Sequence, residues 1–125
     1  MDENQVVWNE KVAKKIIKNL EQRRMEGSYA ATASQAKDEI IAMITPGASV
    51  FRCGTMTATY AGLWESIAEL PEVQLIDPYE PGIAPEEGLS RRQQGMTADF
   101  MIASSNSITL DGKLVNLDGM GNRVA

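Results

Sequence analysis

Apolar residues recur at helical spacing in the first fifth of the chain. Between Asn4 and Met25 the apolar positions are Val6, Trp8, Val12, Ala13, Ile16, Ile17 and Leu20. This pattern predicts an amphipathic N-terminal helix within residues 1–26 that Gly27 ends. Its polar face is basic, with Lys11, Lys14, Lys15, Lys18, Arg23 and Arg24. Such a face is typical of a solvated surface, and a partner-binding or anion-steering face is the alternative.

The middle of the chain alternates between short β-prone runs and helical segments. Core strands are predicted at residues 48–52, 73–76 and 98–104. Helices are predicted from Ser34, as N-cap, to Pro46, and at residues 58–70 and 85–96. Residues 28–32 form a weaker extended segment. Strands that alternate with helices indicate an α/β fold with a mainly parallel sheet flanked by helices.

Two Asp-Gly steps mark the end of the chain. Residues 108–110 and 114–117 are β-prone and flank Asp111-Gly112-Lys113, which predicts a hairpin. The second step, Asp118-Gly119, leads through Gly121 to Asn122 and Arg123. The C-terminal region therefore combines tight turns with concentrated polar chemistry.

Composition and charge exclude several classes of function. The 125 residues are 43% hydrophobic and 23% charged, which fits one soluble domain over residues 1–125. The net charge of −5 argues against a nucleic-acid partner. No apolar run approaches a membrane span and the N-terminus is acidic, so we expect neither membrane association nor secretion. The single cysteine fits the reducing cytoplasm. Because histidine is absent, a Ser-His-Asp triad and a histidine-based zinc site are excluded within one chain, and no metal or cofactor is expected.

Ligands of parallel sheets gather at the carboxyl ends of the strands. The first core strand passes into Gly54, Thr55 and Thr57, whose backbone N–H groups and hydroxyls predict an anion site; the alternative is that a threonine only caps the next helix. Asn106 follows the third strand and either joins this site or locks its own loop. Without a histidine to activate it, Cys53 is expected to be a buried structural cysteine.

The C-terminal residues supply further candidates. Asp111 and Asp118 are candidate catalytic carboxylates, and turn geometry is the alternative role for both. A further group of ligand-binding candidates follows Asp118: Gly119, Gly121, Asn122 and Arg123. The glycines allow close backbone approach, and the amide and guanidinium would bind a carboxylate or phosphate. A salt bridge within the fold is the alternative for the arginine.

The residues at three places resemble the LUD domain family, which is associated with lactate utilisation. They are Trp8-Asn9 with the helix that follows, the Gly54-Thr55-x-Thr57 loop, and the run from Asn106 to Ala125 with both Asp-Gly steps and Asn122-Arg123. The resemblance implies a fold like that of the sugar-phosphate isomerase and CoA-transferase superfamily. It places an anion on the Gly54–Thr57 loop, opposite Asp111 or Asp118. Lys113 departs from the acidic residues that the isomerases have beyond their Asp-Gly step, which disfavours isomerase chemistry.

The resemblance implies a subunit that binds a small anionic metabolite (a phosphate, a carboxylate or a CoA ester) in lactate utilisation, beside iron–sulfur partner subunits. The alternative is a sugar-phosphate isomerase-like or CoA-transferase-like enzyme that uses Asp111 or Asp118 with the Thr55–Thr57 loop. Family members usually continue beyond this length, so we expect the chain to represent the N-terminal portion of the family domain. An exposed sheet edge would then favour a homo-oligomer.

Overall fold

The computed structural model describes residues 1–124, so Ala125, the last residue of the C-terminal pattern, lies outside the described residues. Contacts divide the chain into two compact units, which we describe separately. The first contains residues 1–32 and 105–117, and the second contains residues 33–104 and the residues from Asp118 onward. No helix in the described part of the chain combines the length and apolarity that a membrane span needs.

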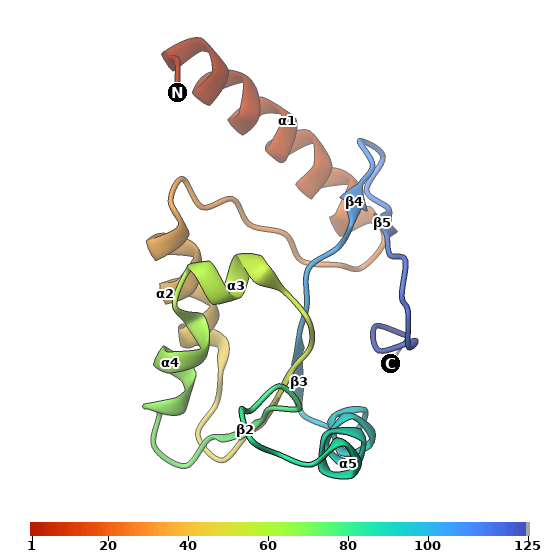
Figure 1. Ribbon diagram of the computed structural model, residues 1–125. Helices are drawn as coiled ribbons and strands as arrows, with labels where there is room; N and C mark the ends of the chain where they lie inside the picture. The colour runs from red at the N-terminus through yellow and green to blue at the C-terminus, as the bar shows by residue number, and fades with distance from the viewer. Residues whose placement is uncertain (125) are drawn as a thin grey trace. The chain divides into compact units, whose positions relative to one another are not determined.

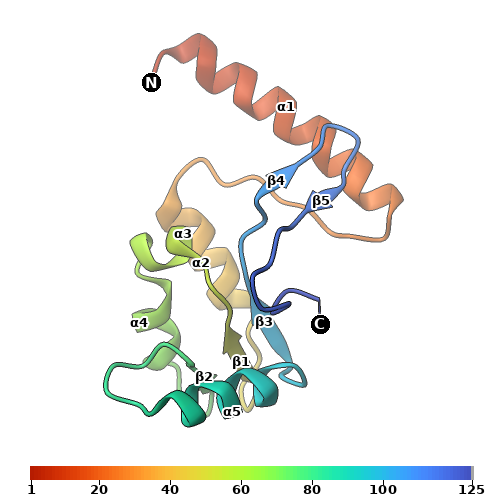
Figure 2. The same ribbon diagram turned by 45° about the vertical axis from the view of Figure 1, so that its right-hand side comes forward.

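The first unit joins one long helix to a hairpin. Helix α1 (Glu3–Gln22) begins after Asp2, whose carboxylate accepts a hydrogen bond from the Asn4 backbone at 3.2 Å. Strands β4 (Ser107–Ile108) and β5 (Leu114–Val115) pair antiparallel, as the Asp-Gly step predicted. Figure 2 shows this hairpin beside the second half of α1. The structure thus confirms both the N-terminal helix and the hairpin.

Gly112 lets the hairpin turn meet α1 closely. Its φ is +80°, and a Cβ there would come within 2.7 Å of the Asn19 backbone. The Asn19 amide donates to the Leu110 carbonyl at 2.7 Å, and Arg23 donates to the Asp111 carbonyl at 3.3 Å. The glycine of the first Asp-Gly step is therefore needed both for the turn and for this contact.

The second unit is built on a parallel sheet of three strands. Strand β1 (Ser49–Arg52) lies between β2 (Gln74–Ile76) and β3 (Phe100–Ile102). Val50 pairs with Leu75 on one side and with Phe100 on the other. The helices are α2 (Ala33–Met43), α3 (Met56–Tyr60), α4 (Leu63–Ala68) and α5 (Pro85–Gly95). A mixed α/β fold with a parallel sheet flanked by helices is therefore confirmed.

Alternate residues of β1 enter two different apolar layers. Val50 packs with Leu63, Trp64 and Ile67 of α4, and this layer extends to the isoleucines of α2. Phe51 enters the opposite layer, which α5 covers. Figure 1 shows α4 and α5 on opposite sides of the strands. Both faces of the sheet are thus covered, as a parallel sheet requires.

Three local expectations are wrong. Residues 58–70 form two short helices rather than one, because Gly62 adopts a left-handed φ of +68° between them. Residues 28–32 contain no strand. Helix α2 already begins at Ala33, so Ser34 lies inside its first turn and is not the N-cap. Tertiary context decides such short segments more than local propensity does.

Gly95 should be the position of α5 most sensitive to a larger side chain. A Cβ there would lie 2.3 Å from the Phe51 ring, which is itself 1% exposed and has no room to move. Replacing a helical glycine with alanine gains about 1 kcal/mol of propensity, but overpacking a core costs about 1–3 kcal/mol.

We therefore expect Gly95→Ala to lower the free energy of unfolding in urea. Gly119→Ala is the control, because nothing lies within 4 Å of a Cβ there. A Gly95→Ala protein as stable as the wild type would contradict this packing.

Candidate functional site

The carboxyl ends of the three parallel strands bring candidate residues to one edge of the sheet. Cys53 extends the ladder beyond β1, because its N–H donates to the Ile102 carbonyl of β3 at 3.1 Å. Two residues further along each chain segment, the Thr55 and Ser104 hydroxyls lie 2.5 Å apart in a hydrogen bond. The loop after β1 is thus fixed to the end of β3.

Thr55 shapes the loop that the sequence identified. Its hydroxyl accepts from the Ala58 N–H at 3.2 Å, and its carbonyl accepts from the Thr59 hydroxyl at 3.1 Å. Thr55 is therefore the N-cap of α3, which is the alternative that the sequence analysis gave to an anion site. Within the described residues, no acceptor is recorded for the backbone N–H groups of residues 54–57. Capping leaves these four donors available, so it does not exclude anion binding.

A cavity of about 200 Å³ opens beside this loop, between α2, α3 and the end of β3. Its lining is mostly apolar and rich in alanine, with three hydroxyl groups from Thr55, Thr57 and Ser104. Lys37 is the one charged residue in the lining. It is half-buried, and among the described residues it has no carboxylate partner. The lining therefore combines Lys37, three hydroxyl-bearing residues and an apolar wall.

Asp118 and Arg123 bind one another. The Arg123 guanidinium donates to Asp118 at 2.5 Å and to the Ser104 carbonyl at 2.7 Å, and the Arg123 backbone N–H donates to the second Asp118 oxygen at 3.2 Å. Each side chain is only 12% exposed. Ser104 thus connects this pair to the loop after β1. Both oxygens of the Asp118 carboxylate accept hydrogen bonds from Arg123.

Gly121 and Asn122 lie on the α5 side of the sheet. The Asn122 amide donates to the Cys53 sulfur at 2.8 Å, and Cys53 is buried at 1% exposure. Both residues line a groove of about 160 Å³ together with Arg92 of α5 and Met96, which follows that helix. Gly119 is exposed, with open space around its Cα. Among the C-terminal candidates, Arg123 therefore has a recorded hydrogen bond to a residue that lines the Lys37 cavity.

Asp111 and Asn106 belong to the first unit. Hydrogen bonds from the Thr109 hydroxyl and from Lys113 lower the pKa of Asp111 below its ordinary value. The Asn106 side chain accepts from the Leu117 N–H at 3.0 Å, which closes the base of the hairpin. The contacts described for both residues lie within the first unit, where Asp111 also binds Arg23 of α1.

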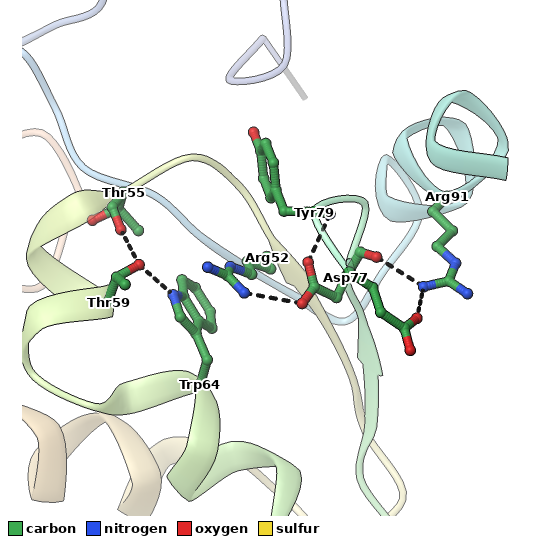
Figure 3. Close-up of polar contacts among 8 residues, drawn as sticks. Arg52, Thr55, Thr59, Trp64, Asp77, Tyr79 and Arg91 are labelled. Carbon is green, nitrogen blue, oxygen red and sulfur yellow. Dashed lines mark hydrogen bonds and ion pairs between the residues drawn. The ribbon is translucent and has the colours of Figure 1, made fainter. Parts of the chain in front are cut away.

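Sequence reasoning missed several polar residues at the strand ends. Figure 3 shows Arg52, at the end of β1, between Trp64 and the Asp77 carboxylate that follows β2. Arg52 donates to Asp77 at 3.0 Å, and its guanidinium lies 5.0 Å from the centre of the Trp64 ring. The strand-end rule that selected Thr55 also applies to Asp77 and Ser104. Lys37 carried no such signal, because it lies in the middle of a helix.

Comparisons with known proteins agree with the C-terminal pattern. The family model of the LUD domain matches residues 13–125, which is well over half of the chain. No curated protein and no solved structure matched the chain. The match includes the Gly54–Thr57 loop, both Asp-Gly steps and the Asn122-Arg123 pair. The chain therefore belongs to the LUD domain family.

Proposed function

We propose that this chain binds a short carboxylic acid, L-lactate or its oxidation product pyruvate, in the cavity beside the Gly54–Thr57 loop. The observation that carries the proposal is Lys37, which lines that cavity and forms no ion pair within residues 1–124. An acid anion in the cavity would supply a partner for its charge.

The size of the cavity favours a small ligand. Pockets for drug-sized ligands occupy roughly 300–1,000 Å³, whereas this cavity is about 200 Å³. A three-carbon acid fills about three water volumes, or roughly 90 Å³. Phosphate would also fit by size, but the alanines, Ile40 and Leu63 in the lining suit a methyl group better than a fully polar ion.

The chemistry of the lining matches the parts of such an acid. Lys37 would bind the carboxylate, with support from the free N–H groups of the Gly54–Thr57 loop. The Thr57 hydroxyl has no hydrogen-bond partner among the described residues and can pair with the hydroxyl or keto oxygen. The Thr55–Ser104 pair would hold the loop in position.

In this role the chain acts as a binding subunit of a lactate-oxidising assembly, beside iron–sulfur partner subunits. Membership of the LUD domain family supports this setting. With one cysteine, the chain cannot supply the four thiolates of a cluster by itself. The electron-transfer centres would therefore belong to its partners.

The alternative of an isomerase-like or CoA-transferase-like enzyme needs a free carboxylate. Both oxygens of Asp118 accept hydrogen bonds from Arg123. The contacts of Asp111 lower its pKa, which makes it a weaker base at neutral pH. These observations favour the binding role over acid–base catalysis.

We further propose self-association through the outer edge of β3. No strand pairs with that edge within residues 1–124. An apolar groove of about 260 Å³ runs along it, lined by Ile40, Met43, Ile44 and residues 100–103. Residues 100–103 include no charge and no proline that would protect an open edge.

L-Lactate should raise the melting temperature of the protein by several degrees at 100 times the Kd, because such binding adds about 2.7 kcal/mol of stability. Lys37→Gln should abolish most of this shift. Lys15→Gln on α1 removes an equal charge outside the cavity and should respond like the wild type. An unchanged lactate response in Lys37→Gln, or no response in the wild type, would contradict the proposal.

Asp118→Asn separates the binding role from the catalytic role. Loss of the Arg123 pair should speed amide hydrogen exchange of residues 118–124 by about tenfold or more, because a hydrogen bond to a charged group contributes about 1.5–3 kcal/mol. Lactate affinity should change much less. Asp111→Asn, the same change at the other Asp-Gly step, should leave this exchange unaltered. Loss of lactate affinity without faster exchange would instead indicate direct contact between Asp118 and the ligand.

Met43→Glu tests the β3 edge. Met43 is 59% exposed, so the substitution should not disturb the core, but it places a charge in the apolar groove. Light scattering should show self-association of the wild type at micromolar concentrations and a shift toward monomer for Met43→Glu. A wild type that stays monomeric across that range would rule out the edge contact.

A further inference from the structure

A second cationic cluster lies at the carboxyl ends of β1 and β2, and the proposed acid cavity does not use it. The cluster consists of Arg52, Tyr79 and Arg92, which come from β1, from the loop after β2 and from α5. The guanidiniums of the two arginines lie 5.6 Å and 5.2 Å from the centre of the Tyr79 ring. None of the three residues lines the Lys37 cavity.

Arg52 is held in a fixed orientation. Its guanidinium donates to Asp77 at 3.0 Å and contacts the rings of Trp64 and Tyr79 (Figure 3). Asp77 is itself fixed by the Tyr79 backbone N–H at 2.8 Å. A guanidinium has five N–H donors, and Asp77 is the only acceptor recorded for Arg52 among the described residues. No buried side-chain nitrogen lacks a partner there, so the remaining donors reach solvent.

Arg92 is the arginine of this region that no carboxylate neutralises. Its neighbour Arg91 binds both Glu80 and Glu87, and these carboxylates raise the pKa of Arg91. Asp77 pairs with Arg52. No acidic side chain within residues 1–124 forms an ion pair with Arg92, which instead stacks on Tyr79. One positive charge therefore remains uncompensated beside the Tyr79 ring.

Tyr79 brings a free hydroxyl to the loop after β1. A Cβ at Gly54 would lie 3.1 Å from this hydroxyl, so glycine is what allows its approach. No hydrogen bond to the hydroxyl is recorded among the described residues. Tyr79 is 44% exposed although its ring is large and apolar. Two guanidiniums near this ring are more than the packing of Arg52 requires, since Trp64 and Asp77 already hold Arg52.

We propose that Arg52, Tyr79 and Arg92 form an oxyanion-binding subsite, separate from the acid cavity, that takes a phosphate group. Planar guanidiniums bind phosphate oxygens through paired N–H donors, and the phenol hydroxyl can donate a further hydrogen bond. Phosphate is favoured over a single carboxylate because its oxygens point in several directions and can accept from donors that approach from different sides. This subsite does not depend on lactate binding.

Titration calorimetry with inorganic phosphate, at constant ionic strength set with chloride, tests the subsite. The wild type should show saturable binding. The Lys37→Gln protein, in which the acid cavity has lost its cation, should bind phosphate more strongly than acetate. Arg92→Gln should weaken phosphate binding at least tenfold, and Tyr79→Phe, which removes only the hydroxyl, should weaken it severalfold. Lys18→Gln on α1 is the matched charge control and should stay within twofold of the wild type.

Two results would overturn the subsite: no saturable phosphate binding by the wild type, or unchanged binding in Arg92→Gln. Equal affinity of the Lys37→Gln protein for acetate and phosphate would overturn the choice of phosphate. If Arg92→Gln does not fold by circular dichroism, Tyr79→Phe decides, because it retains the ring on which the arginines stack. Lys37→Gln should leave phosphate binding intact, so failure of the lactate proposal and failure of this one are distinguishable.

Discussion

The parallel pairing of β1 with both of its neighbours is the constraint on which the candidate site depends. It ends all three strands at one edge of the sheet, and the Cys53 N–H extends the β1–β3 ladder by one residue. The Thr55 and Ser104 hydroxyls can then meet at 2.5 Å. Without that register, Thr55, Thr57 and Ser104 would not line one cavity with Lys37.

The order of the strands separates two kinds of polar chemistry. The chain leaves β1 toward α3 and α4, and it leaves β2 toward α5 on the other face. The Lys37 cavity lies on the α2 and α3 side, where small apolar residues surround a single cation. The arginine cluster lies at the ends of β1 and β2.

Strong local signals were enough to predict much of the fold. The apolar period of α1, the Asp111-Gly112 turn and the alternation of strands and helices all led to the observed elements. The break at Gly62 was missed because a lone glycine in a helical pattern does not reveal its φ. The missed residues of the site depend on tertiary contacts. Lys37 becomes a candidate only because α2 places it in the same cavity as Thr55.

The same contrast applies to the C-terminal residues. Their spacing identified the family, but the structure shows Asp118 and Arg123 bound to each other and Asn122 bound to Cys53. From the sequence alone, a carboxylate and a guanidinium can be ligand-binding groups or can form a salt bridge with each other. Only the distance between them distinguishes the two roles.

We infer that the Gly54–Thr57 loop and Lys37 form one site for a short organic acid. A titration of the ¹⁵N-labelled protein with L-lactate, followed in amide correlation spectra, tests it most directly. We expect saturable shifts centred on the amides of residues 54–58, with further shifts at Lys37 and Ser104. Shifts confined to other residues, or none at a large excess of lactate, would contradict it.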